Sequence, residues 1–98
     1  AIVLVINNDG YLIERVLHED GAYNDIQMWD YSKLPAAFGG SQAIGIRVTT
    51  EGELESALSL AAKERDKVVL IDLCLPARDC SPGLSRLGET YRESVRKK

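Results

Sequence analysis

The feature that most constrains the fold is an uninterrupted apolar run, Ile2 to Ile6, that ends at the polar segment 7–10. Such a run, mostly β-branched and bounded by turn residues, is typical of a strand buried on both faces of a parallel sheet. The polar segment then lies at the carboxyl end of the strand, where open α/β sheets bind ligands. Its asparagines and aspartate offer oxygen atoms, and Gly10 allows close approach of the main chain, so a site for a hard cation such as Mg²⁺ is indicated. Taken without other information, asparagines and Asp-Gly after a strand most often form a tight turn rather than a metal site.

Helical and extended patterns alternate along the rest of the chain. The predicted elements are, in order, a strand at 2–6, a helix at 11–18 ended by residues 19–21, a strand at 44–48, a helix at 50–65, a strand at 68–75 and a helix from 82 onward. This order is that of a doubly wound parallel sheet. Three strands do not complete such a sheet, so we expect an α/β fold with a partial doubly wound parallel sheet whose neighbours lie on the rest of the polypeptide or on another chain.

Local signals refine several of these elements. Thr50 and Glu53 have the spacing of a capping box, and Ser81 with Pro82 predicts the start of the last helix. We expect a short helical stretch within 31–38 to be interrupted by Pro35. The helices are predicted to pack through apolar stripes, listed here: Ile13, Val16 and Leu17; Leu54, Ala57, Leu58, Ala61 and Ala62; Leu84, Leu87, Tyr91 and Val95. The last stripe is expected to cover a core or to contact another subunit.

The composition is that of a soluble globular domain. The chain has 98 residues, 45% of them apolar and 28% charged, which suffices for one domain with a modest core. Its net charge of −3 gives no reason to expect nucleic acid or an anionic membrane as a partner. Cys74 and Cys80 lack metal-site spacing, so we expect reduced thiols in a cytoplasmic protein. Because the chain starts at Ala1 inside a strand pattern, we interpret its start as a cut.

Residues 7–14, Asn-Asn-Asp-Gly-Tyr-Leu-Ile-Glu, resemble the second half of the thiamine diphosphate motif of the 2-oxo acid decarboxylases of the pyruvate and indolepyruvate decarboxylase type. The resemblance continues through residues 23–26, 29–31 and 34–35 and through the segment from 49 to 80. It therefore covers nearly the whole chain. It implies that residues 1–98 are the carboxyl-terminal portion of the diphosphate- and magnesium-binding domain, with the remaining domains absent from this chain.

The resemblance assigns a metal and cofactor role to the turn. It implies that the Asn8 side chain and the Gly10 main-chain carbonyl bind Mg²⁺, which in turn holds the cofactor's diphosphate. Tyr11 and Ile13, together with these two residues, are expected to contact the cofactor. Asn7 is expected to support the turn rather than to touch the metal.

The same resemblance makes Glu14 the catalytic acid that works beside the cofactor's thiazolium ring. Such a carboxyl group must hold and give a proton near neutral pH, and we expect partial burial against Ile13 and Leu17 to raise its pKa in that direction. Ile13 and Leu17 match positions that line the substrate pocket. For His18 and for a buried Trp29 indole, we expect packing rather than catalysis.

The implied activity is the non-oxidative decarboxylation of a 2-oxo acid to an aldehyde and carbon dioxide, with pyruvate, indolepyruvate, phenylpyruvate and branched-chain acids all open as substrates. The Gly-Asp-Gly half of the motif and the activating glutamate are absent from the chain. We therefore expect them from the rest of the same enzyme, in a homodimer or homotetramer, and expect the isolated chain to be inactive. The alternative is a non-catalytic α/β binding or interaction module that uses residues 7–10 for an anion or a partner.

Overall fold

A computed structural model describes residues 1–18 and 21–97, and the predicted helix end at Glu19 and Asp20 lies outside this part. The chain divides into two compact units. The sheet unit comprises Ala1–Asn7 and Met28–Leu75, and the helical unit comprises Asn8–Gln27 and Pro76–Lys98.

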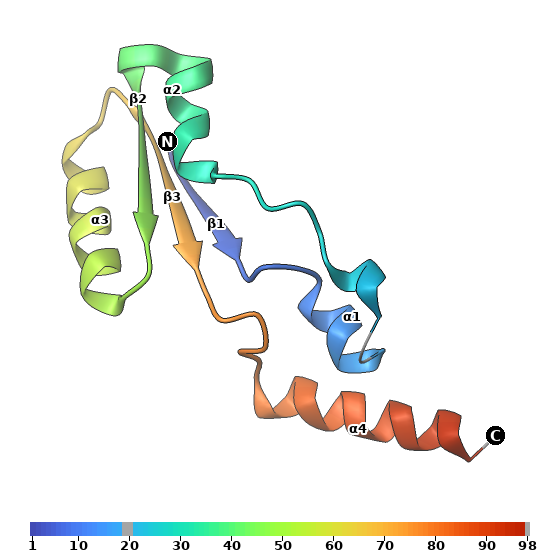
Figure 1. Cartoon of the computed structure of the whole chain (residues 1–98). Helices are drawn as coiled ribbons and strands as arrows, with labels where there is room; N and C mark the ends of the chain where they lie inside the picture. Colours follow the sequence, from blue (N-terminus) through green and yellow to red (C-terminus); the bar gives the residue numbers. More distant parts are fainter. Residues whose placement is uncertain (19–20, 98) are drawn as a thin grey trace. The chain divides into compact units, whose positions relative to one another are not determined.

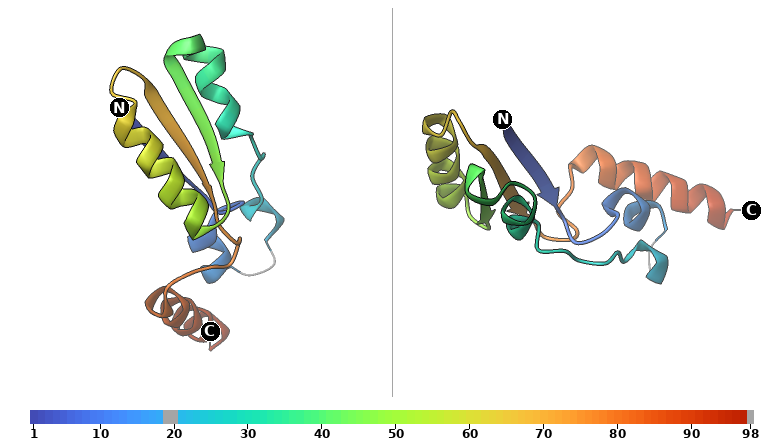
Figure 2. Two further views of the ribbon diagram at one scale, coloured as in Figure 1. Left: turned by 90° about the vertical axis from the view of Figure 1, so that its left-hand side faces the viewer. Right: turned by 90° about the horizontal axis from the view of Figure 1, so that it is seen from above.

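The sheet unit contains the predicted parallel sheet. Its strands are β1 (Ile2–Asn7), β2 (Ala43–Val48) and β3 (Val68–Cys74), all parallel and in the order β1-β3-β2 (Figure 1). Helix α2 (Leu34–Gly39) and helix α3 (Glu51–Lys63) lie on opposite faces of the sheet (Figure 2). Helices on both faces of a parallel sheet confirm the prediction of a partial doubly wound α/β fold.

The core of this unit lies between β3, β2 and α3. Val48, Ala57, Ala61, Val69 and Ile71 are buried, so the small residues of the α3 stripe let the helix approach the sheet closely. The stripe was predicted too wide, because its Leu58 and Ala62 positions are exposed.

Strand β1 is not buried as its sequence predicted. Ile2, Val3, Leu4 and Ile6 are 51%, 43%, 49% and 59% exposed. The physical reason is position: among the described residues β1 pairs only with β3 and forms an edge of the sheet, whereas β3 pairs on both sides and carries buried residues. The expectation of burial on both faces is therefore wrong for this chain and fits β3 instead.

The segment before β2 also differs from its prediction. Pro35 lies in the first turn of α2, after a 3₁₀ turn at Tyr31–Lys33, so it begins the helix instead of interrupting it. A second 3₁₀ turn, Gly40–Gln42, leads into β2. The Trp29 indole is 59% exposed and contacts the Tyr31 ring, which corrects the expectation of a buried indole.

The predicted caps are confirmed. The Thr50 hydroxyl accepts a hydrogen bond from the Glu53 amide at 3.2 Å, and Glu53 Oε2 accepts from the Thr49 amide at 2.8 Å. The Ser81 hydroxyl accepts from the Leu84 amide at 3.1 Å at the start of helix α4 (Pro82–Arg96). The Thr50 and Ser81 side chains each satisfy an amide that the first helical turn leaves without a partner, and Glu53 reaches back to the residue before the cap.

In the helical unit, α4 packs against the six-residue helix α1 (Leu12–Leu17). Gly88 allows this contact, because a Cβ atom there would overlap the side chain and the carbonyl oxygen of Val16. The rings of His18 and Tyr91 meet edge to face at 5.4 Å, which confirms a packing role for the histidine.

The apolar stripe of α4 is less covered than its periodicity suggested. Leu84 is half-buried, whereas Leu87 and Val95 are 55% and 52% exposed. Both cysteines are free thiols, as predicted. None of the helices in the described residues is long and apolar enough to cross a membrane.

Candidate functional site

The turn at Asn8–Gly10 follows β1 directly and has an unusual main-chain conformation. Asp9 has a φ of 55° and Gly10 a φ of 138°. The second value lies where L side chains are strained, and a Cβ atom on Gly10 would also overlap the Arg15 guanidinium group. Gly10 is buried and Asn8 is half-buried. Glycine is therefore required at this position for the conformation of the turn itself.

Arg15 holds this turn from the side of α1. Its Nη2 atom donates to the Asp9 carbonyl oxygen at 2.6 Å and to Asp25 Oδ1 at 2.9 Å. The Arg15 side chain is only 17% exposed, whereas that of Asp25 is 72% exposed. The guanidinium group itself is therefore largely shielded from water, whereas the Asp25 carboxylate is not.

The 3₁₀ turn at Ala22–Asn24 supplies a further restraint. The Tyr11 amide donates to the Asn24 carbonyl oxygen at 3.1 Å. The Asn24 side chain is 2% exposed and donates through Nδ2 to the His18 carbonyl oxygen at 3.0 Å. Sequence reasoning assigned no role to Arg15, Asn24 or Asp25. For Arg15, the signal in the sequence was its place on the inner side of a short helix, because a polar side chain that is buried there needs a hydrogen-bond partner.

Successive residues of α1 are about 100° apart around its axis, and this rotation divides the helix into two sides. Leu12, Arg15 and Val16 share one side, where all three are half-buried. The other side carries the predicted catalytic and substrate residues Ile13, Glu14 and Leu17. Helical geometry thus groups these three residues within an arc of about 100°.

The predicted site residues on α1 are more exposed than expected. Tyr11 and Ile13 are 56% and 53% exposed, and Leu17 is half-buried. Glu14 is exposed, so the expected partial burial of its side chain against Ile13 and Leu17 is wrong for this chain. The reason is that the short helix turns this side to solvent and packs against α4 through the other side.

A buried polar contact lies at the end of β1. Asn7 Nδ2 donates to Asp72 Oδ1 at 3.0 Å, and Asp72 is 1% exposed in the central strand β3. Asp72 Oδ2 has no hydrogen-bond partner in the described part of the chain. The sequence marked Asp72 only as an interruption of an apolar strand, but the structure shows it as the partner of Asn7 across the sheet.

The donor set of the turn fits part of a Mg²⁺ site. The Asn8 side-chain oxygen and the Gly10 carbonyl oxygen are neutral, hard ligands of the kind that Mg²⁺ accepts. Across residues 1–18 and 21–97, no group of three or more His, Cys, Asp or Glu side chains could hold a metal ion. The turn can therefore supply two ligands, while carboxylate, phosphate and water ligands have to come from outside these residues.

Comparison with known proteins gives relatives described as alpha-keto-acid decarboxylases. No model of a known protein family matches the chain. The chain is 43% identical over 76 residues to an alpha-keto-acid decarboxylase of Mycobacterium tuberculosis (strain H37Rv), a match that covers 76% of this chain and 14% of that protein. It is 39% identical over 87 residues to an alpha-keto-acid decarboxylase of Mycobacterium ulcerans, covering 88% of this chain and 15% of that protein. The chain thus spans about a seventh of the length of these relatives, and the matches support a 2-oxo acid decarboxylase family without indicating a specific member.

Proposed function

We propose that this chain provides part of the active site of a 2-oxo acid decarboxylase that uses thiamine diphosphate and Mg²⁺. The reaction would release carbon dioxide from a 2-oxo acid and yield an aldehyde. The observation that carries the proposal is the arrangement of α1: Ile13, Glu14 and Leu17 share one accessible side of the helix that directly follows the turn at Asn8–Gly10. The similarity to alpha-keto-acid decarboxylases supports the choice of reaction.

In this proposal the turn binds the metal. Asn8 would contribute its side-chain oxygen and Gly10 its main-chain oxygen, and Tyr11 and Ile13 would contact the cofactor. Arg15 keeps the turn in shape through its bond to the Asp9 carbonyl. When bound, thiamine diphosphate supplies an electron sink for the carbon that loses carbon dioxide.

Glu14 supplies the proton chemistry of the proposed site. Its carboxyl group would hold a proton on one oxygen atom and give it to the reacting carbon, a step that typically contributes about 10²- to 10⁴-fold in rate. Ile13 and Leu17, which flank Glu14 on the same side of the helix, would contact the substrate side chain and exclude water. The exposed state of this side leaves it open to such contacts.

The proposed site is incomplete without further protein. Two neutral oxygen ligands do not form a Mg²⁺ site, and the chain corresponds to about 14% of its relatives' length. We therefore propose that a segment carrying Gly-Asp-Gly and an activating glutamate joins it in a homodimer or homotetramer. The isolated chain, mixed with 2-oxo acid, thiamine diphosphate and Mg²⁺, should give no turnover.

The test is a chimera in which this chain replaces the matching segment of a mycobacterial alpha-keto-acid decarboxylase. The chimera should form aldehyde from a 2-oxo acid, and Glu14→Gln should lower its kcat by at least about a hundredfold, since the amide cannot give the proton. Asn8→Ala should raise the Mg²⁺ concentration needed for half-maximal activity while leaving Glu14 in place.

The matched control is Glu55→Gln, which changes an exposed glutamate on α3 in the same way. It should leave both kcat and the Mg²⁺ requirement unchanged. A folded chimera in which the Glu14→Gln variant is as active as its parent would contradict the assigned acid. A folded chimera without any activity would favour the non-catalytic binding module.

A further inference from the structure

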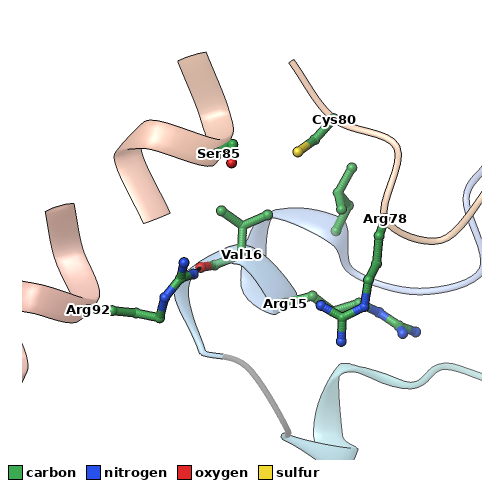
Figure 3. Close-up of a pocket in the computed structure, with 7 residues that line it drawn as sticks. Arg15, Val16, Arg78, Cys80, Ser85 and Arg92 are labelled. Atoms are coloured by element: carbon green, nitrogen blue, oxygen red, sulfur yellow. Dashed lines mark hydrogen bonds between the residues drawn. The ribbon is translucent and has the colours of Figure 1, made fainter. Parts of the chain in front are cut away.

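Three buried side-chain atoms of the described residues have no hydrogen-bond partner: Arg15 Nε, Asn24 Oδ1 and Asp72 Oδ2. Arg15 and Asn24 line cavities of about 160 and 330 Å³, which have room for water (Figure 3 shows the first of them). Asp72 is 1% exposed and lies in the central strand β3. An unpaired carboxylate oxygen in such a place lowers stability, so a role other than stabilising the fold is indicated.

The other oxygen atom of Asp72 accepts a hydrogen bond from Asn7 Nδ2 at 3.0 Å. Asn7 pairs with Cys74 in the parallel register, and Asp72 precedes Cys74 by two residues, so the Asn7 and Asp72 side chains lie on the same face of the sheet. Two leucines at these positions would leave no polar atom unpaired, and the replacement of buried charged groups by apolar ones is often neutral or stabilising. Stability alone therefore does not explain the Asn7–Asp72 pair.

Asn7 is the last residue of β1, and its peptide group leads into the turn at Asn8–Gly10. The Asn7 carbonyl oxygen accepts a hydrogen bond from the Leu75 amide at 2.8 Å. Because the peptide group is planar, a fixed Asn7 carbonyl also fixes the direction in which the chain continues to Asn8. Both the side chain and the main chain of Asn7 are thus held in place directly before the predicted metal ligand.

We propose that Asp72 is a positioning residue for the Mg²⁺ site, an inference that rests on the proposed function. Asp72 does not bind the metal itself. A carboxylate only accepts hydrogen bonds, so it fixes which end of the Asn7 amide faces β3 and thereby orders the end of β1. Asn8 and Gly10 then present their oxygen atoms to the ion without first having to be ordered. Groups that hold metal ligands in place typically change metal affinity by about 10- to 100-fold.

The experiment measures Mg²⁺ binding to the chimera with the mycobacterial relative by isothermal calorimetry, in the presence of thiamine diphosphate and separately from turnover. Three variants are compared with the parent chimera. Asp72→Leu removes the acceptor, the Asn7→Leu/Asp72→Leu double variant removes both polar groups, and the Asn7→Asp/Asp72→Asn double variant exchanges donor and acceptor. Urea denaturation measures the free energy of unfolding of each variant.

Both leucine variants should weaken Mg²⁺ binding about tenfold and raise the Mg²⁺ concentration for half-maximal activity by the same factor, with kcat at saturating Mg²⁺ unchanged. The double-leucine variant is the informative one, because it should be close to the parent in stability and still bind Mg²⁺ weakly. The exchanged pair should restore most of the affinity. The control Asp66→Leu replaces an exposed aspartate of the sheet unit and should bind Mg²⁺ as the parent does.

Two results would overturn the positioning role alone. One is a double-leucine variant that binds Mg²⁺ as tightly as the parent chimera. The other is an exchanged pair that binds Mg²⁺ as weakly as the double-leucine variant. A folded parent chimera that binds no Mg²⁺ would overturn the proposed metal site together with this inference, so the two failures are distinguishable.

Discussion

Replacing Arg15 tests whether the turn at Asn8–Gly10 is held by a main-chain contact or by a surface ion pair. Arg15 makes both: a hydrogen bond to the Asp9 carbonyl at 2.6 Å and an ion pair with Asp25 at 2.9 Å. Asp25→Asn deletes only the ion pair, whereas Arg15→Ala deletes both contacts. Alanine and arginine have similar helix propensities, so the comparison is little affected by α1 itself.

The two contacts are expected to contribute different free energies to the stability of the chain. A hydrogen bond from a charged donor contributes about 1.5 to 3 kcal/mol, and Arg15 is well shielded, with a side chain 17% exposed. The ion pair is discounted to about 0.5 kcal/mol or less because the Asp25 side chain is 72% exposed. Arg15→Ala should therefore lower the free energy of unfolding by ~2 to 4 kcal/mol once lost packing of its stem is included, and Asp25→Asn by less than ~1 kcal/mol.

Urea denaturation followed by far-UV circular dichroism measures these free energies, and hydrogen exchange of the Tyr11 amide reports on the turn locally. This amide donates to the Asn24 carbonyl at 3.1 Å, so its exchange should be faster in the Arg15→Ala variant and nearly unchanged in the Asp25→Asn variant. About 1 M salt should abolish the contribution of the Asp25 ion pair to the free energy of unfolding and leave most of the loss caused by Arg15→Ala. An Asp25→Asn cost equal to that of Arg15→Ala, or unchanged Tyr11 exchange in Arg15→Ala, would refute the reasoning.

Other contacts lead to predictions of the same kind. Gly88→Ala should destabilise the chain by ~1 to 3 kcal/mol in urea denaturation, because the added methyl group overlaps α1. Asn7→Leu should cost ~1 to 3 kcal/mol by leaving the buried Asp72 carboxylate without its donor, and adding Asp72→Leu should recover much of this loss in a double-mutant cycle. The pKa of Asp30 is lowered chiefly by the hydrogen bond from the Ser32 hydroxyl, so its stabilising effect is present at neutral pH and is lost as the pH falls below the ordinary aspartate value; Ser32→Ala should raise this pKa in a ¹³C NMR titration.

The sequence predicted the elements whose signals are local. Apolar runs marked the strands, and the caps at Thr50 and Ser81 were predicted because a hydroxyl side chain three residues before an amide needs nothing but the helix itself. The sequence-based prediction failed where the burial of an element depends on its neighbours in the fold. Strand β1 has the composition of a central strand, yet its partners place it at an edge, and no periodicity reports which neighbours a strand will have.

The site shows the same division. The turn residues followed from the motif. The predicted apolar face of Ile13, Val16 and Leu17 is wrong in part, because Val16 lies on the inner side of α1 while Ile13 is exposed. The partners of Arg15 were not predicted. A contact from Arg15 to a carbonyl six residues earlier depends on the left-handed conformation of Asp9, which the sequence alone does not display. The hydrogen-bond partner of a half-buried arginine can be predicted only when the conformation of the turn that accepts the hydrogen bond is known.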